Sequence, residues 1–319
     1  MTCCYPPEGH LLNTAENRAA CSSLDGLRRA MEHQTVLEGL ALLCSAEHDL
    51  TVELGGGLRG VIPRTEAALG IAEGSTRDIA ILSRVGRPVS FVVEGLEGQN
   101  GTVCPRLSRR KAQRMALDAL LERCCPGLIL PATVTHLEPF GAFVDLGCGV
   151  PSMIGIEHIS VSRIAHPCQR FSVGQDIYVV VQDLDRERER IYLTHRELLG
   201  TWAENAAPFQ PGMTVSGTVR GIKDYGAFIE LTPNLSGLAE LQPDLHEGER
   251  VSVYIKSILP HRMKIKLQVI GHLPPAPPAP LVYAQTEGRL TYWRYAPEGC
   301  TRVGGETVFL DESPKSLAD

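Results

Sequence analysis

The 319-residue sequence has few aromatic residues, no excess of positive charge and no closely paired cysteines of the CxxC type. Aromatic residues make up only 5% of the chain, so a ring outside a core pattern carries more information than usual. The formal net charge of -6 argues against non-specific binding to phosphates by bulk charge. Any contact with nucleic acid must therefore come from local basic patches.

The ten cysteines give no indication of a metal site. Two pairs are direct neighbours, Cys3-Cys4 and Cys124-Cys125, whose side chains are poorly placed to share a metal. Residues 1–12 lack a signal-peptide pattern, and no segment approaches 18 continuous apolar residues. We therefore predict a cytoplasmic protein with reduced thiols, no metal, no cofactor and no membrane segment.

A seven-residue pattern that occurs twice indicates a repeated module. The first copy reads Phe140-Gly141-Ala142-Phe143-Val144-Asp145-Leu146, and the second reads Tyr225-Gly226-Ala227-Phe228-Ile229-Glu230-Leu231. Two later segments also agree and share one register, since residues 173–177 match 247–251 and residues 190–193 match 264–267. A looser copy at residues 48–54 has Thr51 where the other copies have phenylalanine.

Strand alternation separates the side chains of this pattern into two faces. The inward face of the first copy is apolar and consists of Ala142, Val144 and Leu146. The opposite face, which we expect to be wet, carries Phe143 and Asp145, and in the second copy Phe228 and Glu230. A ring on a wet face gains nothing from burial, whereas nucleic-acid bases stack on such rings for roughly 1–3 kcal/mol each.

The orientation of Phe140 is left open by the sequence. It lies three residues before Phe143, so strict alternation would point it inward, whereas Gly141 permits a bulge that would re-aim it. Core packing is the alternative to base stacking for every ring of the two copies.

The repeats predict a mainly β protein of three tandem five-stranded barrels of the OB type, because five short strands with a long connection after the third describe that fold. We divide the chain into a helical leader (1–34), a degenerate barrel (35–108), a basic helical connector (109–125), a barrel (126–199), a linker (200–210), a shortened barrel (211–270), a proline-rich spacer (271–280) and an aromatic β tail (281–319).

The flanking segments allow more than one interpretation. In the leader, Thr14 and Ser22 or Ser23 are available as caps for one or two short helices. The basic connector would either track an RNA backbone or contact an acidic flank of a neighbouring repeat. The tail suggests a hairpin turning at Glu287-Gly288, and its rings would stack on RNA, bind a partner or cover a sheet edge.

The second repeat resembles the S1 RNA-binding domain of bacterial ribosomal protein S1 and of several ribonucleases. The resemblance rests on Gly149-Val150-Pro151-Ser152-Met153-Ile154, His166-Pro167, Val173-Gly174, Asp183-Leu184-Asp185 and Arg190-Ile191-Tyr192-Leu193-Thr194. It is clear in the third repeat and faint in the first. As a whole, the chain resembles the short S1-like ribosomal proteins of anaerobic Gram-positive bacteria.

The resemblance implies a surface for single-stranded RNA made of two exposed aromatics, a histidine, an aspartate and an arginine. In the second repeat Phe140, Phe143, Asp185 and Arg190 take four of these positions. The histidine position holds Gly155, and His158 is displaced from it by three residues. A turn-forming role for Asp185 and a solvated edge charge for Arg190 are the alternatives.

In the third repeat, Tyr225, Phe228 and Lys264 take the corresponding aromatic and basic positions. Glu240 stands at the histidine position and Leu259 at the aspartate position, and the connection before the fourth strand is shorter. We therefore expect the second repeat to carry most of the binding, the third less and the first none.

These features together imply a non-catalytic protein of the translation apparatus that binds single-stranded messenger RNA. The implied partners are RNA and the 30S ribosomal subunit, the latter through residues 1–110, and we expect a monomer away from the ribosome. A scaffold or regulatory protein that uses the barrels for protein contacts is the alternative and fits the acidic net charge. No clustered acidic metal site, glycine-rich phosphate loop or paired nucleophile and base indicates an enzyme.

Overall fold

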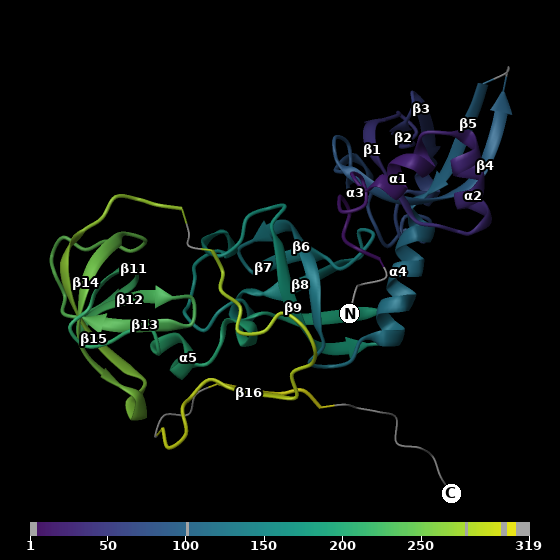
Figure 1. The fold of residues 1–319 in the computed structure, drawn as a ribbon. Helices are drawn as coiled ribbons and strands as arrows, with labels where there is room; N and C mark the ends of the chain where they lie inside the picture. Colours follow the sequence, from purple (N-terminus) through teal and green to yellow (C-terminus); the bar gives the residue numbers. More distant parts are fainter. Residues whose placement is uncertain (1–4, 100–101, 278–279, 301–304, 311–319) are drawn as a thin grey trace, which may run out of the picture. The chain divides into compact units, whose positions relative to one another are not determined.

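The computed structural model describes residues 5–99, 102–277, 280–300 and 305–310, and confirms three closed five-stranded barrels (Figure 1). Barrel one consists of β1 (Leu37–Cys44), β2 (Leu50–Gly55), β3 (Leu58–Ile62), β4 (Pro88–Gln99) and β5 (Thr102–Ser108). Barrel two consists of β6 (Ile129–Glu138), β7 (Gly141–Asp145), β8 (Pro151–Gly155), β9 (Asp176–Asp185) and β10 (Arg190–Thr194). Barrel three consists of β11 (Thr214–Lys223), β12 (Gly226–Thr232), β13 (Leu235–Ala239), β14 (Arg250–Leu259) and β15 (Lys264–His272).

All three barrels have the same strand order. The first strand pairs with the second and fourth, and the fifth lies between the third and fourth. The contact between the third and fifth strands is parallel in each barrel, and the other described pairings are antiparallel. This is the Greek-key arrangement of an OB barrel. In that fold the second and third strands present the binding face.

The helices lie in the leader and between the strands. They are α1 (Ala15–Cys21), α2 (Leu24–Glu32), α3 (Ile79–Leu82), α4 (Arg109–Arg123) and α5 (Trp202–Ala206), with single 3₁₀ turns η1 (Arg64–Glu66), η2 (Ile156–His158), η3 (Pro167–Gln169), η4 (Arg196–Leu199) and η5 (Pro260–Arg262). Thr14 caps α1 by accepting from the Asn17 amide, and Ser23 caps α2 by accepting from the Gly26 amide. The helical leader is thus confirmed, and of the one or two short helices expected there the structure has two.

The inward half of the strand alternation is also confirmed. Ala142, Val144 and Leu146 are buried in barrel two. Ala227 and Ile229 occupy the same positions in barrel three and have no exposed surface. The inward positions of this motif in barrels two and three are therefore filled by aliphatic side chains, whereas the core of barrel one also contains the ring of Phe91.

The chain divides into two compact units. The first comprises the described residues up to 123 together with 131–133 and 145–152, and the second comprises 124–130, 134–144 and the described residues from 153 onward. Among the described residues, no helix has the length and apolar character needed to cross a membrane.

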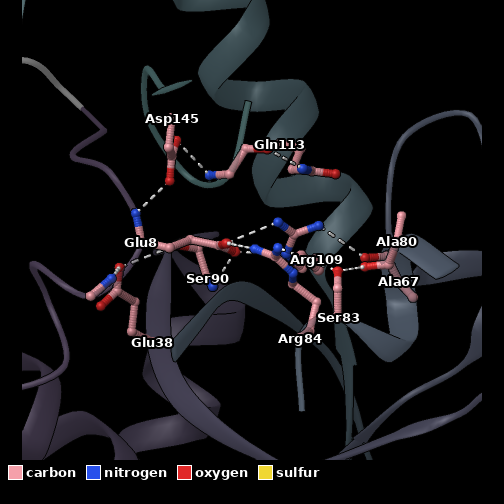
Figure 2. A network of polar contacts seen from close by, with 12 residues as sticks. Glu8, Glu38, Ala67, Ala80, Ser83, Arg84, Ser90, Arg109, Gln113 and Asp145 are labelled. Carbon is pink, nitrogen blue, oxygen red and sulfur yellow. Dashed lines mark hydrogen bonds and ion pairs between the residues drawn. The ribbon is translucent and has the colours of Figure 1, made fainter. Parts of the chain in front are cut away.

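Asp145 is buried, so its predicted place on a wet face was wrong (Figure 2). One carboxylate oxygen accepts from the Glu8 amide at 2.8 Å, and the other accepts from the Gly147 and Gly149 amides at 2.8 and 2.9 Å. Alternation failed here because a partner 137 residues away covers this end of β7. The three amides replace the water that the carboxylate gives up.

Glu8 belongs to the same buried network in the first unit (Figure 2). The Arg109 guanidinium donates to both of its carboxylate oxygens, at 2.6 and 2.9 Å, and both side chains are about 5% exposed. Although burial opposes ionisation, the Arg109 charge holds the pKa of Glu8 below its ordinary value. The fork of the guanidinium thus fixes α4 to the segment that precedes the leader helices.

The C-terminal tail forms a small hairpin, but its turn is not at Glu287-Gly288. The strands are β16 (Tyr292–Arg294) and β17 (Glu306–Val308), which pair antiparallel. Residues 288–290 instead pair with the segment before β6, since the Gly288 carbonyl accepts from the Ile129 amide and the Leu290 amide donates to the Gly127 carbonyl. Residues 311–319 of the predicted tail lie outside the described residues.

The network predicts a pH-dependent stability. Burial and the adjacent negative charge of Glu8 raise the pKa of Asp145 from 3.8 to about 7. Between pH 3.8 and about 7, Asp145 is protonated in the folded chain and ionised in the unfolded chain. Because the folded chain binds this extra proton, the contribution of Asp145 to stability falls as the pH rises toward 7. Relative to Asp145→Asn, the unmodified chain should lose on the order of 2 kcal/mol of unfolding free energy between pH 5 and pH 8.

Urea unfolding of both chains at the two pH values measures this difference. Asp118→Asn, which removes an exposed carboxylate from α4, is the matched control and should show no such change. An equal difference between the unmodified chain and Asp145→Asn at both pH values would contradict the assigned titration.

Candidate nucleic-acid interface

Barrels two and three each carry a pair of aromatic rings at the start of their second strand. Phe140 and Phe143 meet edge to face, with centroids 6.0 Å apart and planes at 87°. Tyr225 and Phe228 repeat this arrangement at 6.1 Å and 87°. The first ring of each pair is exposed, Phe140 by 56% and Tyr225 by 70%, and the second is half-buried.

The exposed position of Phe140 is explained by the turn that it occupies. The residue precedes β7 instead of belonging to it, so strand alternation does not fix its direction. The following glycine is required for close strand approach, because a Cβ on Gly141 would lie 2.5 Å from the Ile154 carbonyl oxygen. Gly226 has the same constraint, since its φ is +147° and a Cβ there would lie 2.5 Å from the Ala239 carbonyl oxygen.

Backbone register extends the ring pair of barrel three into a row across the sheet and places a second exposed ring on barrel two. In barrel three, Phe228 is opposite Leu238, and Leu238 is opposite Lys266. In barrel two, Met153 is opposite Tyr192, whose ring is 42% exposed. The sequence analysis did not predict these neighbours. Tyr192 and Lys266 could have been found, because each lies between two apolar strand residues and therefore points outward.

The predicted polar residues of barrel two lie where β9 ends and β10 begins. Asp185 ends β9 and accepts from the Arg188 amide at 2.9 Å, which is the turn-forming role that was the alternative. Arg190 begins β10, is exposed and has Asp185 as its backbone partner. Asp185 lines a cleft of about 820 Å³ together with Tyr192 and His158.

In barrel three the structure brings the predicted residues together. Tyr225, Phe228 and Lys264 line one cleft of about 890 Å³, which also contains Lys266 and Leu238. Glu240, at the histidine position, is instead bound to Lys256 at 3.1 Å outside this cleft's lining.

Glu230 is buried, so the prediction of a wet position was wrong here as well. The Arg220 guanidinium donates to its two oxygens at 3.0 and 3.1 Å, and Arg170 of barrel two donates to one of them. The two arginines come from elsewhere in the chain, which is why alternation within β12 did not reveal them. The acid of the second copy of the motif, Glu230, thus forms buried ion pairs with two arginines that have a structural role.

Asn234, in the turn between β12 and β13, connects barrel three to barrel two and is fully buried. Its side-chain oxygen accepts from the Val161 amide at 2.9 Å. Its side-chain nitrogen donates to the carbonyls of Arg196 and Gly200 at 2.8 and 2.9 Å. One amide group therefore holds the backbone groups of Val161, Arg196 and Gly200.

The arginines of the connector are used within the first unit. Arg109 binds Glu8, Arg110 lies 2.6 Å from Glu73, and Arg114 lies 3.5 Å from Asp118. The Arg110–Glu73 pair is a contact with an acidic residue of a neighbouring repeat, which was one of the two alternatives, whereas Glu8 lies in the leader and Asp118 in α4 itself.

The tail rings divide between burial and exposure. Trp293 and Phe309 are buried, and Tyr283 packs edge to face against His195 with centroids 5.5 Å apart. Burial lowers the pKa of His195 to about 4, so this ring is neutral at physiological pH. Tyr292 is exposed and donates to Glu306.

The fold and the ring pairs define a class: a protein of tandem OB-type barrels, two of which carry an exposed aromatic pair. Residues 126–196 match the family model of the S1 RNA binding domain, which confirms the S1-like resemblance predicted from the repeats. Within the described residues, no group of three His, Cys, Asp or Glu side chains is placed to hold a metal ion.

Curated proteins similar to this chain include small ribosomal subunit proteins. The protein bS1 of Staphylococcus aureus strain COL is 28% identical over 234 residues, covering 68% of this chain and 58% of the relative. The protein bS1 of Staphylococcus haemolyticus is 29% identical, covering 68% and 57%. The chain therefore spans somewhat more than half the length of the curated relatives it matches.

Solved structures give only weak likenesses. A multidomain protein with nucleic acid binding domains from Streptococcus pneumoniae is 13% identical, covering 73% of this chain and 72% of its own, with a TM-score of 0.24. GSP13 from Bacillus subtilis is 27% identical, covering 23% and 57%, with a TM-score of 0.22. Both scores are too low to establish a common arrangement of the chains.

Proposed function

We propose that this chain binds single-stranded RNA, without catalysis, by stacking bases on the Phe140/Phe143 and Tyr225/Phe228 pairs. The observation that carries the proposal is the recurrence of one edge-to-face geometry, with an exposed outer ring, at the same position of two barrels. An exposed ring contributes nothing to the barrel core, and every base offers a π-face on which such a ring can stack.

Exposed basic side chains of the two barrels would offset the phosphate charge. Arg190 in barrel two and Lys264 in barrel three are exposed, and Lys264 shares a cleft with its ring pair. Asp185 would accept from a base donor with the carboxylate oxygen that does not hold the turn. These local positive charges would allow contact with phosphates despite the net charge of -6.

Two platforms on one chain would act together on a longer strand. Once one platform holds the RNA, the second meets it at a high effective concentration. Barrel one has Thr51 in place of the ring and would not stack bases. The relatives named as small ribosomal subunit proteins favour the small ribosomal subunit as the partner. We propose messenger RNA as the ligand and the cytoplasm as the location, as the sequence resemblance implies.

Barrel one offers a feature that suits protein contact. Ile79, Leu82 and Val85 are exposed by 66%, 45% and 40% in and after α3. Such clustered apolar side chains favour docking to a protein surface. We therefore propose that residues 1–110 attach to the small subunit, and the scaffold alternative would use the same surface.

Replacing both rings of a platform tests the RNA proposal. The Phe140→Ala/Phe143→Ala chain should bind a labelled single-stranded pyrimidine- or A-rich 12-mer at least about tenfold more weakly than the unmodified chain, about 1.4 kcal/mol. Fluorescence anisotropy at increasing KCl measures this, and binding should weaken with salt. Tyr254→Ala, an exposed ring on β14 outside the platforms, is the control. Unchanged affinity in the double variant would refute the platform.

Sedimentation tests the ribosome proposal separately. The full chain should pellet with purified small subunits, and Ile79→Asp/Leu82→Asp should lower the recovered fraction because charge is placed where apolar contact is expected. Val282→Asp, at an exposed apolar residue of the tail, is the matched control. Equal recovery of all three chains would reject docking through α3.

A further inference from the structure

The cleft beside Tyr225 and Phe228 is not made by barrel three alone. Its lining includes Val161, Ser162 and Arg163, which belong to the connection between β8 and β9 of barrel two, and Tyr295 of the tail. Two segments from outside barrel three therefore form part of the wall around the ring pair.

The charge of this cleft is strongly one-sided. Arg163, Lys223, Lys264 and Lys266 all line it and are exposed. In the part of the chain that the structure describes, no ion pair engages any of these four side chains. The carboxylate in the lining is Glu247, which accepts from the Ile222 amide at 3.1 Å. Arg220 also lines the cleft, but its charge is matched by Glu230.

The segment that carries Arg163 is fixed in place by barrel three. The Val161 amide donates to the Asn234 side chain at 2.9 Å, and the Ser162 amide donates to the Pro233 carbonyl at 3.1 Å. The Ser162 and Ser236 hydroxyls are 2.9 Å apart. Two consecutive residues are thus anchored directly before Arg163, so the backbone position of Arg163 at the cleft is fixed before a ligand binds, which lowers the entropic cost of using this side chain.

We infer that the RNA site of barrel three is composite: barrel two supplies Arg163 to a phosphate of the nucleotide whose base stacks on Tyr225 and Phe228. The inference rests on the proposed function and deepens it. Lys264 and Lys266 face the same strand of RNA from β15, and guanidinium and ammonium groups on both sides of a stacked base form the charged groove that single-strand binders use.

This changes the expected ranking of the two barrels. Barrel three was expected to bind less because Glu240 and Leu259 depart from the family pattern within the third repeat, whereas Arg163 comes from the second. With Arg163 added, its cleft has four unmatched cations and a ring pair in one place. The cleft of barrel three is thus a principal binding site whose completeness depends on barrel two.

Binding of a uridine hexanucleotide to full-length variants tests the inference. In the Phe140→Ala/Phe143→Ala background, where the barrel-three platform remains, Arg163→Ala should weaken binding about fivefold, and the slope of log K against log salt should become shallower by about 0.7 for the lost phosphate contact. In the Tyr225→Ala/Phe228→Ala background, Arg163→Ala should have no effect. Arg77→Ala, which removes an exposed arginine of the first unit, controls for net charge.

Each outcome distinguishes the inference from the proposed function. An equal Arg163→Ala effect in both backgrounds, or none in either while RNA binding persists, overturns the composite site and leaves the RNA proposal standing. Failure of the unmodified chain to bind at low salt overturns both. Thermal unfolding of every variant confirms that the exposed substitutions leave the fold intact, and Arg163→Lys should retain most of the salt slope.

Discussion

The arrangement of the second unit depends on one buried amide, the side chain of Asn234. It forms hydrogen bonds of 2.8 to 2.9 Å with the Val161 amide and with the carbonyls of Arg196 and Gly200, and Asn234 has no exposed surface. The backbone carbonyl of Asn234 accepts from the Tyr295 hydroxyl, which adds the tail to the same junction. Each of these groups would be costly to bury without a partner, so the junction specifies one geometry for the segments that meet there.

The repeated motif has two roles that alternation alone does not separate. Its rings point outward and remain available, whereas the acid two residues after the second ring is buried in both barrels. Asp145 is satisfied by amides, including that of Glu8, and Glu230 is satisfied by Arg170 and Arg220. The motif therefore combines an exposed ring pair with buried contacts that hold the barrel to other segments of the chain.

Much of the fold was predictable because it depends on local pattern. The inward alternation of Ala142, Val144 and Leu146 and the capping residues Thr14 and Ser23 need only their own neighbours in sequence. The burial of Asp145 and the position of the tail turn were predicted wrongly because their partners are distant in sequence. Of the candidate site, sequence predicted the rings and Lys264, but the partners across strands, Leu238 and Lys266, depend on register, and Arg163 depends on the junction at Asn234.

The chain is acidic overall, yet unmatched positive charge gathers in one cleft. The proposed function requires RNA to contact the ring pairs of barrels two and three. Photo-cross-linking of the full chain to a single strand containing 4-thiouridine, followed by mass spectrometry of the linked peptides, tests these contacts directly. We predict cross-links at Phe140 or Phe143 and at Tyr225 or Phe228; cross-links confined to barrel one or to the tail would contradict it.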